Sequence, residues 1–162
     1  MLSFSSADFC GTILPMDKEP SSFPEVVCLV FFRNGKLLLE QRLDDDAFYG
    51  RWTFTGGKIE DGESVEEASI REAGEETGLA PLSIQCLVSF RGVSRNGNSY
   101  LFHGVLVKEW GGRLVNREGS QKRRLKWVPL ERAEEFIGDT NVDREVLREF
   151  SRQKLNTAVK PD

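Results

Sequence analysis

Residues 57–79, GKIEDGESVEEASIREAGEETGL, carry the pattern that decides the fold of this chain. Ser64 and Glu67 have the spacing of a capping box, in which each side chain accepts a hydrogen bond from the other residue's backbone N–H. Gly78 suits the left-handed position that closes a helix. The stretch therefore predicts a loop that runs into a helix over Val65–Thr77.

The predicted helix gathers three carboxylates in its last turns, those of Glu72, Glu75 and Glu76. Like charges at these spacings repel each other, which favours a bound cation. Glu72 and Glu76 continue the side that apolar residues begin, so a solvated acidic face explains them poorly. Arg71 is placed to pair with Glu75 or to reach back to Glu63. Oxygen ligands of this kind suit a hard cation such as Mg²⁺ or Mn²⁺ rather than zinc.

The whole stretch resembles the Nudix box, whose pattern is G-x5-E-x7-R-E-U-x-E-E-x-G-U, with U an apolar residue. Every specified place is filled, by Gly57, Glu63, Arg71, Glu72, Ala73, Glu75, Glu76, Gly78 and Leu79. The resemblance covers about residues 25–130, because 26–42 and 50–60 are similar to the first hairpin and the pre-box strand of MutT-like members. Thr55 is a departure, since many members carry proline there.

The resemblance implies an α/β fold, a Nudix-type α/β/α sandwich with a mixed central sheet. It also implies Mg²⁺- or Mn²⁺-dependent hydrolysis of a nucleoside diphosphate linked to a further group. Carried over by position, the metal ligands are Glu72, Glu75, Glu76 and the backbone carbonyl of Gly56. Structural roles within the motif fall to Gly57, Glu63, Arg71 and Gly78. The general base stays open between a glutamate of the box and Glu118, which is equally well an exposed loop carboxylate.

Substrate contacts are predicted at three polar residues. Arg42 and Lys58 match basic positions of MutT-like relatives and are candidates for phosphate contacts. Asn141 stands where such an enzyme carries a base-reading asparagine. Each also has a plainer interpretation, since Arg42 and Lys58 are ordinary surface charges and Asn141 is a suitable helix cap.

Aromatic residues in the predicted strands are candidates for stacking on a base, although strand aromatics more often belong to the core. They are Phe54, Phe90, Phe102 and Trp127. The single histidine, His103, is expected to be packed or at the sheet surface rather than catalytic.

The rest of the chain alternates strand and helix patterns. Strands are expected at Val26–Phe32, Lys36–Arg42, Trp52–Thr55, Leu82–Val93, Tyr100–Trp110 and Leu125–Val128, and further helices at Leu130–Phe136 and Val142–Gln153. Asn34-Gly35 between the first two strands is a hairpin signal. One catalytic domain is expected over 23–155, with an extension over 1–22 and a tail over 156–162.

Composition supports a single folded domain, with 162 residues of which 39% are apolar and 30% charged. The cysteines, Cys10, Cys28 and Cys86, have neither zinc-site nor disulfide spacing and favour a reducing cytoplasm. The first residues lack the features of a signal peptide or membrane span. The expected partner is a nucleotide or nucleoside diphosphate derivative. No membrane or clear nucleic-acid partner is expected, and the oligomeric state is not predicted.

Three functions are compatible with these patterns. The first is hydrolysis of a nucleoside triphosphate, including an oxidised purine one, to monophosphate and pyrophosphate. The second is the same chemistry on ADP-ribose, a nucleotide sugar or a dinucleoside polyphosphate. The third is a silent binding module, which the complete acidic cluster disfavours because that cluster destabilises its own helix without a cation.

Overall fold

The fold is a mixed sheet enclosed by helices, and the computed structural model describes residues 23–43, 50–93, 97–115, 123–138 and 141–158. The strands are β1 (Glu25–Arg33), β2 (Lys36–Arg42), β3 (Trp52–Thr53), β4 (Thr55–Lys58), β5 (Leu79–Val93), β6 (Ser99–Gly112) and β7 (Arg123–Pro129). The helices are α1 (Val65–Thr77), the 3₁₀ turn η2 (Leu130–Arg132), α2 (Ala133–Ile137) and α3 (Asn141–Ala158).

Strand β1 is the centre of the sheet. It runs parallel to β6 and antiparallel to β2 and β4. The path of paired strands is β3-β2-β1-β6-β5, while β4 pairs with β1 and β7 pairs with β2. Because parallel and antiparallel pairs meet at β1, the sheet is mixed, as the family resemblance implies.

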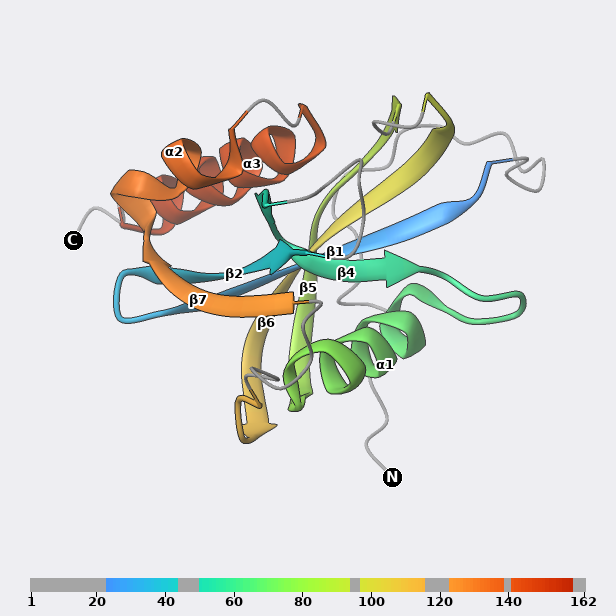
Figure 1. Ribbon diagram of the computed structural model, residues 1–162, viewed down its shortest axis with the longest axis horizontal. Helices are drawn as coiled ribbons and strands as arrows, with labels where there is room; N and C mark the ends of the chain where they lie inside the picture. The colour runs from blue at the N-terminus through green and yellow to red at the C-terminus, as the bar shows by residue number, and fades with distance from the viewer. Residues whose placement is uncertain (1–22, 44–49, 94–96, 116–122, 139–140, 159–162) are drawn as a thin grey trace.

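The side chains of β1 alternate between two cores, one on each face of the sheet. Val27, Leu29 and Phe31 pack with residues of α1, whereas Cys28 and Val30 pack with residues of α2 and α3. Figure 1 shows α1 on one face and α2 with α3 on the other. This arrangement confirms the α/β/α sandwich.

The ends of α1 lie at the predicted residues. The Ser64 side chain accepts from the Glu67 backbone N–H, and the Glu67 side chain accepts from the Ser64 N–H, which is a complete capping box. Gly78 closes the helix with φ of 71°, in the left-handed region that favours glycine.

Some predicted boundaries are wrong. The strand expected over Trp52–Thr55 is interrupted at Phe54, whose N–H donates to Asp143 Oδ1 at 3.2 Å instead of to a neighbouring strand. The helix expected over Leu130–Phe136 is the η2 turn followed by short α2. Both β5 and α3 are longer than their apolar patterns indicate.

The cysteines described by the structure, Cys28 and Cys86, are free and buried, as expected of core residues. Burial raises the pKa of the Cys28 thiol, and the nearby Asp143 carboxylate raises it further. Within the described residues, no helix has the length and apolar character needed to cross a membrane. The domain boundaries stay a prediction, and the extension over 1–22 lies outside the described residues.

Candidate functional site

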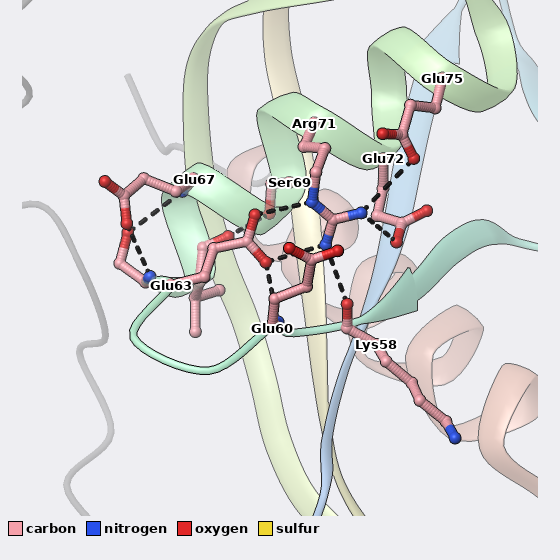
Figure 2. A network of polar contacts seen from close by, with 10 residues as sticks. Lys58, Glu60, Glu63, Glu67, Ser69, Arg71, Glu72 and Glu75 are labelled. Carbon is pink, nitrogen blue, oxygen red and sulfur yellow. Dashed lines mark hydrogen bonds and ion pairs between the residues drawn. The ribbon is translucent and has the colours of Figure 1, made fainter.

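Arg71 is the centre of a polar network that joins α1 to the loop before it (Figure 2). Its Nε and Nη2 atoms donate to the two carboxylate oxygens of Glu63, each at 2.8 Å. Nη2 also donates to the backbone carbonyl of Lys58 at 2.9 Å. Nη1 donates to Glu72 at 2.7 Å and, more weakly, to Glu75 at 3.5 Å. One guanidinium thus ties together β4, the loop and the acidic end of α1.

The Glu63–Arg71 pair holds charges of both signs in place. Hydrogen bonds from Arg71 and from the Glu60 backbone N–H lower the pKa of Glu63 from 4.5 to about 2. The same pair, together with Glu72, raises the pKa of Arg71 above its ordinary value. The fork of the guanidinium matches the carboxylate on two atoms, which is the strong form of this interaction. The structure therefore supports the structural roles that the sequence assigns to Glu63 and Arg71.

Glu72 lies directly against the backbone of β4. A Cβ added to Gly57 would overlap the Glu72 carboxylate, so a larger residue there would displace that carboxylate from its present position. A Cβ on the neighbouring Gly56 would overlap the carbonyl oxygen of Val27. The two glycines let β4 approach both its partner strand and the helix, and they place the Gly56–Gly57 peptide beside the Glu72 carboxylate.

The three glutamates of the helix differ in exposure. The side chain of Glu72 is 10% exposed and that of Glu75 is 60% exposed. Glu76 is half-buried. Within the ranges that the structure describes, no three His, Cys, Asp or Glu side chains meet closely enough to hold a metal ion. Glu72 and Glu75 turn toward Arg71 instead, yet their oxygens are the donor type that a hard cation takes.

The basic candidates lie on different strands. Lys58 ends β4 next to the glycine pair, and its side chain points away from Arg71 (Figure 2) to lie 5.7 Å from the Tyr100 ring centroid. Arg42 ends β2, with its Nε 3.8 Å from Glu40 Oε1. The structure brings Lys58 to the acidic cluster through its backbone carbonyl. Arg42 instead lies near Glu40 of its own strand and hydrogen-bonds through its backbone to residues 50–51.

The remaining candidates lie apart from the α1 cluster. Asn141 is the exposed first residue of α3, across the sheet from α1. Glu118 lies outside the described residues. The aromatic candidates belong to the two cores: Phe54, Phe90 and Phe102 to the α3 side, Trp127 to the α1 side. Phe90 and Phe102 stack on each other with centroids 5.7 Å apart.

Asp143 is a buried carboxylate whose depth the sequence analysis missed. It lies in the first turn of α3, only 7% exposed, and accepts the Phe54 N–H. Helical spacing does place it on the apolar face, three, four and seven residues before the buried Val146, Leu147 and Phe150. The signal is easily overlooked, because an acidic residue at a helix start normally faces solvent and complements the dipole.

His103 is packed, as expected. Its Nδ1 is 2.8 Å from Ser89 Oγ and its Nε2 is 2.9 Å from Glu25 Oε2, so the ring is held between β5 and β1. The network lies on the sheet and joins β1, β5 and β6.

Comparison with known proteins gives matches over most of the chain. Residues 22–150 match the model of the NUDIX domain. The CTP pyrophosphohydrolase of Escherichia coli is 34% identical over 113 residues, which are 69% of this chain and 80% of that protein. The 8-oxo-dGTP diphosphatase of Haemophilus influenzae is 35% identical over 87 residues, 54% of this chain and 63% of that protein.

Solved structures share the architecture. The solution structure of the E. coli ORF135 protein has a TM-score of 0.68 at 29% identity, covering 86% of this chain and 94% of that one. The crystal structure of a MutT NUDIX hydrolase from Burkholderia pseudomallei has a TM-score of 0.66 at 25% identity, covering 78% and 96%.

Proposed function

This chain belongs to the Nudix hydrolase family, and we propose that it cleaves a nucleoside triphosphate to the monophosphate and pyrophosphate with Mg²⁺ or Mn²⁺ bound. The observation that carries the proposal is the packing of Glu72 between Arg71 and the Gly57 backbone, beside two further glutamates. Such a cluster is costly for a helix unless a cation and a polyphosphate meet it.

The residues present fit a hard divalent cation. Glu72, Glu75 and Glu76 offer carboxylate oxygens, and the Gly56 carbonyl is a further candidate beside the Glu72 carboxylate. The exposed side chain of Glu75 is free to change rotamer, since only a 3.5 Å contact holds it to Arg71. When bound, the cation supplies charge that neutralises the polyphosphate and favours ionisation of a water molecule.

The protein's own contribution is to hold these carboxylates in a fixed orientation. Arg71 fixes Glu72 from one side and the Gly57 backbone limits it from the other. Glu63, kept ionised by its low pKa, holds Arg71 in that orientation. We assign acceptance of the proton from the attacking water to Glu75 or to Glu118, and the activity of Glu118→Gln distinguishes them.

Substrate placement is proposed from the basic and polar residues around the sheet. Lys58 and Arg42 are assigned to phosphate oxygens, and Asn141 to the base. Asp143, buried beside Phe54 and Cys28, adds a carboxylate able to accept from an exocyclic amino group. A triphosphate is favoured because relatives similar to this chain are named for CTP and 8-oxo-dGTP.

A second candidate substrate is ADP-ribose. It is favoured by one observation, the 28% identity over 123 residues with a protein named ADP-ribose pyrophosphatase from Methanocaldococcus jannaschii. Hydrolysis of a nucleoside triphosphate and of ADP-ribose would both break a phosphoanhydride link. The two substrates differ in the group attached beyond the diphosphate, which is a third phosphate in one and a ribose in the other.

The experiment combines a substrate panel with matched glutamine variants. Purified protein is assayed with Mg²⁺ on the common nucleoside triphosphates, 8-oxo-dGTP, ADP-ribose, a nucleotide sugar and a dinucleoside polyphosphate, with pyrophosphate and monophosphate release measured. Glu76→Gln should lower kcat/KM by roughly 10²-fold or more on every substrate turned over, because it removes a ligand charge.

Glu66→Gln is the matched control, since Glu66 lies in the first turn of the same helix, away from the cluster. It should retain wild-type activity. Wild-type turnover by Glu76→Gln, or absence of any turnover by wild-type protein across the panel, contradicts the proposal.

A further inference from the structure

Thr55 carries a buried hydroxyl that no neighbour satisfies. It is the first residue of β4, pairs with Leu29 of β1 and is fully buried. Within the described parts of the chain, its Oγ1 makes no hydrogen bond. Buried side-chain hydroxyls almost always have a partner, since an unsatisfied one opposes folding. Packing alone does not explain a hydroxyl at this position, because an apolar side chain of the same shape would fill it without that cost.

The Thr55 side chain faces α1. Residues two apart on a strand share a face, so Thr55 points the same way as Gly57, which touches the Glu72 carboxylate. Its cross-strand partner Leu29 belongs to the core that includes Ala68 and Ala73 of α1. The strand register and the core to which Leu29 belongs therefore both place the Thr55 side chain on the α1 side of the sheet.

The position along α1 follows from the geometry of strand and helix. A short loop joins β4 to α1, and the helix runs back along the strand (Figure 1). Two residues of a strand advance about 6.7 Å, and four residues of a helix advance about 6 Å. Since Gly57 lies against Glu72, these rises lead us to expect Thr55 beside the turn that carries Glu76.

We propose that Thr55 is a positioning residue for Glu76, its Oγ1 hydroxyl donating a hydrogen bond to the Glu76 carboxylate when a divalent cation is bound. The inference rests on the proposed metal-dependent function. A carboxylate has lone pairs on both oxygens, so it accepts from the hydroxyl while its other oxygen faces the cation. The bond fixes the rotamer of the ligand, as outer hydrogen bonds do for ligands in many metal sites.

The test compares Thr55→Val, which removes the hydroxyl at nearly constant shape, with Thr55→Ser, which keeps it. Mn²⁺ affinity is measured from the electron paramagnetic resonance signal of the free ion, and the Tm of metal-free protein by circular dichroism. Thr55→Val should weaken Mn²⁺ binding about five- to tenfold, the equivalent of one hydrogen bond. Its metal-free Tm should equal or exceed that of wild type, because an unsatisfied hydroxyl is gone. Thr55→Ser should bind within about twofold of wild type.

Thr53→Val is the matched control, because Thr53 lies in the preceding strand, β3, and its hydroxyl donates to the Phe54 carbonyl. It should leave Mn²⁺ affinity unchanged. In a Glu76→Gln background, Thr55→Val should cause no further loss of affinity, since the acceptor charge is already removed.

Unchanged Mn²⁺ affinity in a folded Thr55→Val protein overturns the inference, as does a full additional loss in the Glu76→Gln background. A failure of the proposed function can be distinguished from a failure of this inference. In that case the wild-type protein itself would neither bind Mn²⁺ nor turn over any member of the substrate panel.

Discussion

Replacing Gly57 with alanine tests whether the close approach of β4 to Glu72 supports catalysis. An added Cβ would lie 2.6 Å from Glu72 Oε2 and closer to the other carboxylate atoms, whereas real Cβ atoms essentially never come under 3.0 Å. The φ of Gly57 is not in the left-handed range, so alanine can adopt this backbone. The strain therefore falls on the carboxylate, which must move away from β4.

The structure sets the expected size of the effect. Relieving the overlap requires a shift of up to about 1 Å, and a displacement of that size in a catalytic group costs roughly 10²-fold in rate. The shift also loosens the 2.7 Å ion pair between Arg71 and Glu72. A partly exposed pair of this kind contributes at most about 1 kcal/mol, and its loss lowers the Tm of a domain of this size by about 2–4 °C. Activity should fall far more than stability.

The assay measures kcat/KM over a series of Mg²⁺ concentrations, with Tm from circular dichroism. Gly57→Ala should need more Mg²⁺ for half-maximal activity. Gly74→Ala is the control on the same helix, because its added Cβ meets nothing within 4 Å. That control should gain up to about 1 kcal/mol from helix propensity and keep its activity. Wild-type kcat/KM and Mg²⁺ dependence in a stable Gly57→Ala protein would refute the reasoning.

Two further predictions concern the Arg71 network. The pKa of Glu63 is lowered from 4.5 to about 2, so its pair with Arg71 stabilises the fold fully above pH 4.5 and ceases to do so as the pH falls toward 2. The Tm difference between wild type and Glu63→Gln should therefore be constant from about pH 5 upward and shrink between pH 4.5 and pH 2, as thermal unfolding at each pH will show. A difference that stays the same over that range contradicts this. Arg71→Lys keeps the charge but loses the fork that joins Glu63, Glu72 and the Lys58 carbonyl, so Mn²⁺ affinity or kcat/KM should fall about 10- to 100-fold. Equal values for arginine and lysine would show that charge alone suffices.

Local signals predict α1 and its loop to the residue. Ser64, Glu67 and Gly78 define the helix through contacts within a few positions, and such contacts are visible in sequence. The Glu63–Arg71 pair could also be predicted from the sequence, because both residues belong to one motif. Strand β2 also has the bounds that its sequence pattern predicts.

Contacts between distant segments account for the errors. The break between β3 and β4 comes from the Phe54 N–H donating to Asp143, 89 residues away. The extension of α3 past Gln153 accompanies a hydrogen bond from that side chain to the Leu87 carbonyl on β5. The register shifts in β5, one of them between Pro81 and Ser83, depend on its pairing with β6 and are not apparent from apolar spacing. The burial of Asp143 is different, because its place on the apolar face of α3 follows from helical spacing.

The alternation along β1 has a consequence for how such a protein diversifies. Residues 27, 29 and 31 support the α1 side, and residues 28 and 30 support the α3 side, so one strand serves as a partition between two separately packed halves. Substitutions confined to the even positions and their α3 neighbours leave the packing behind Glu72 untouched. A gene library built on that half alone therefore varies one core while the half that bears the glutamates keeps its sequence.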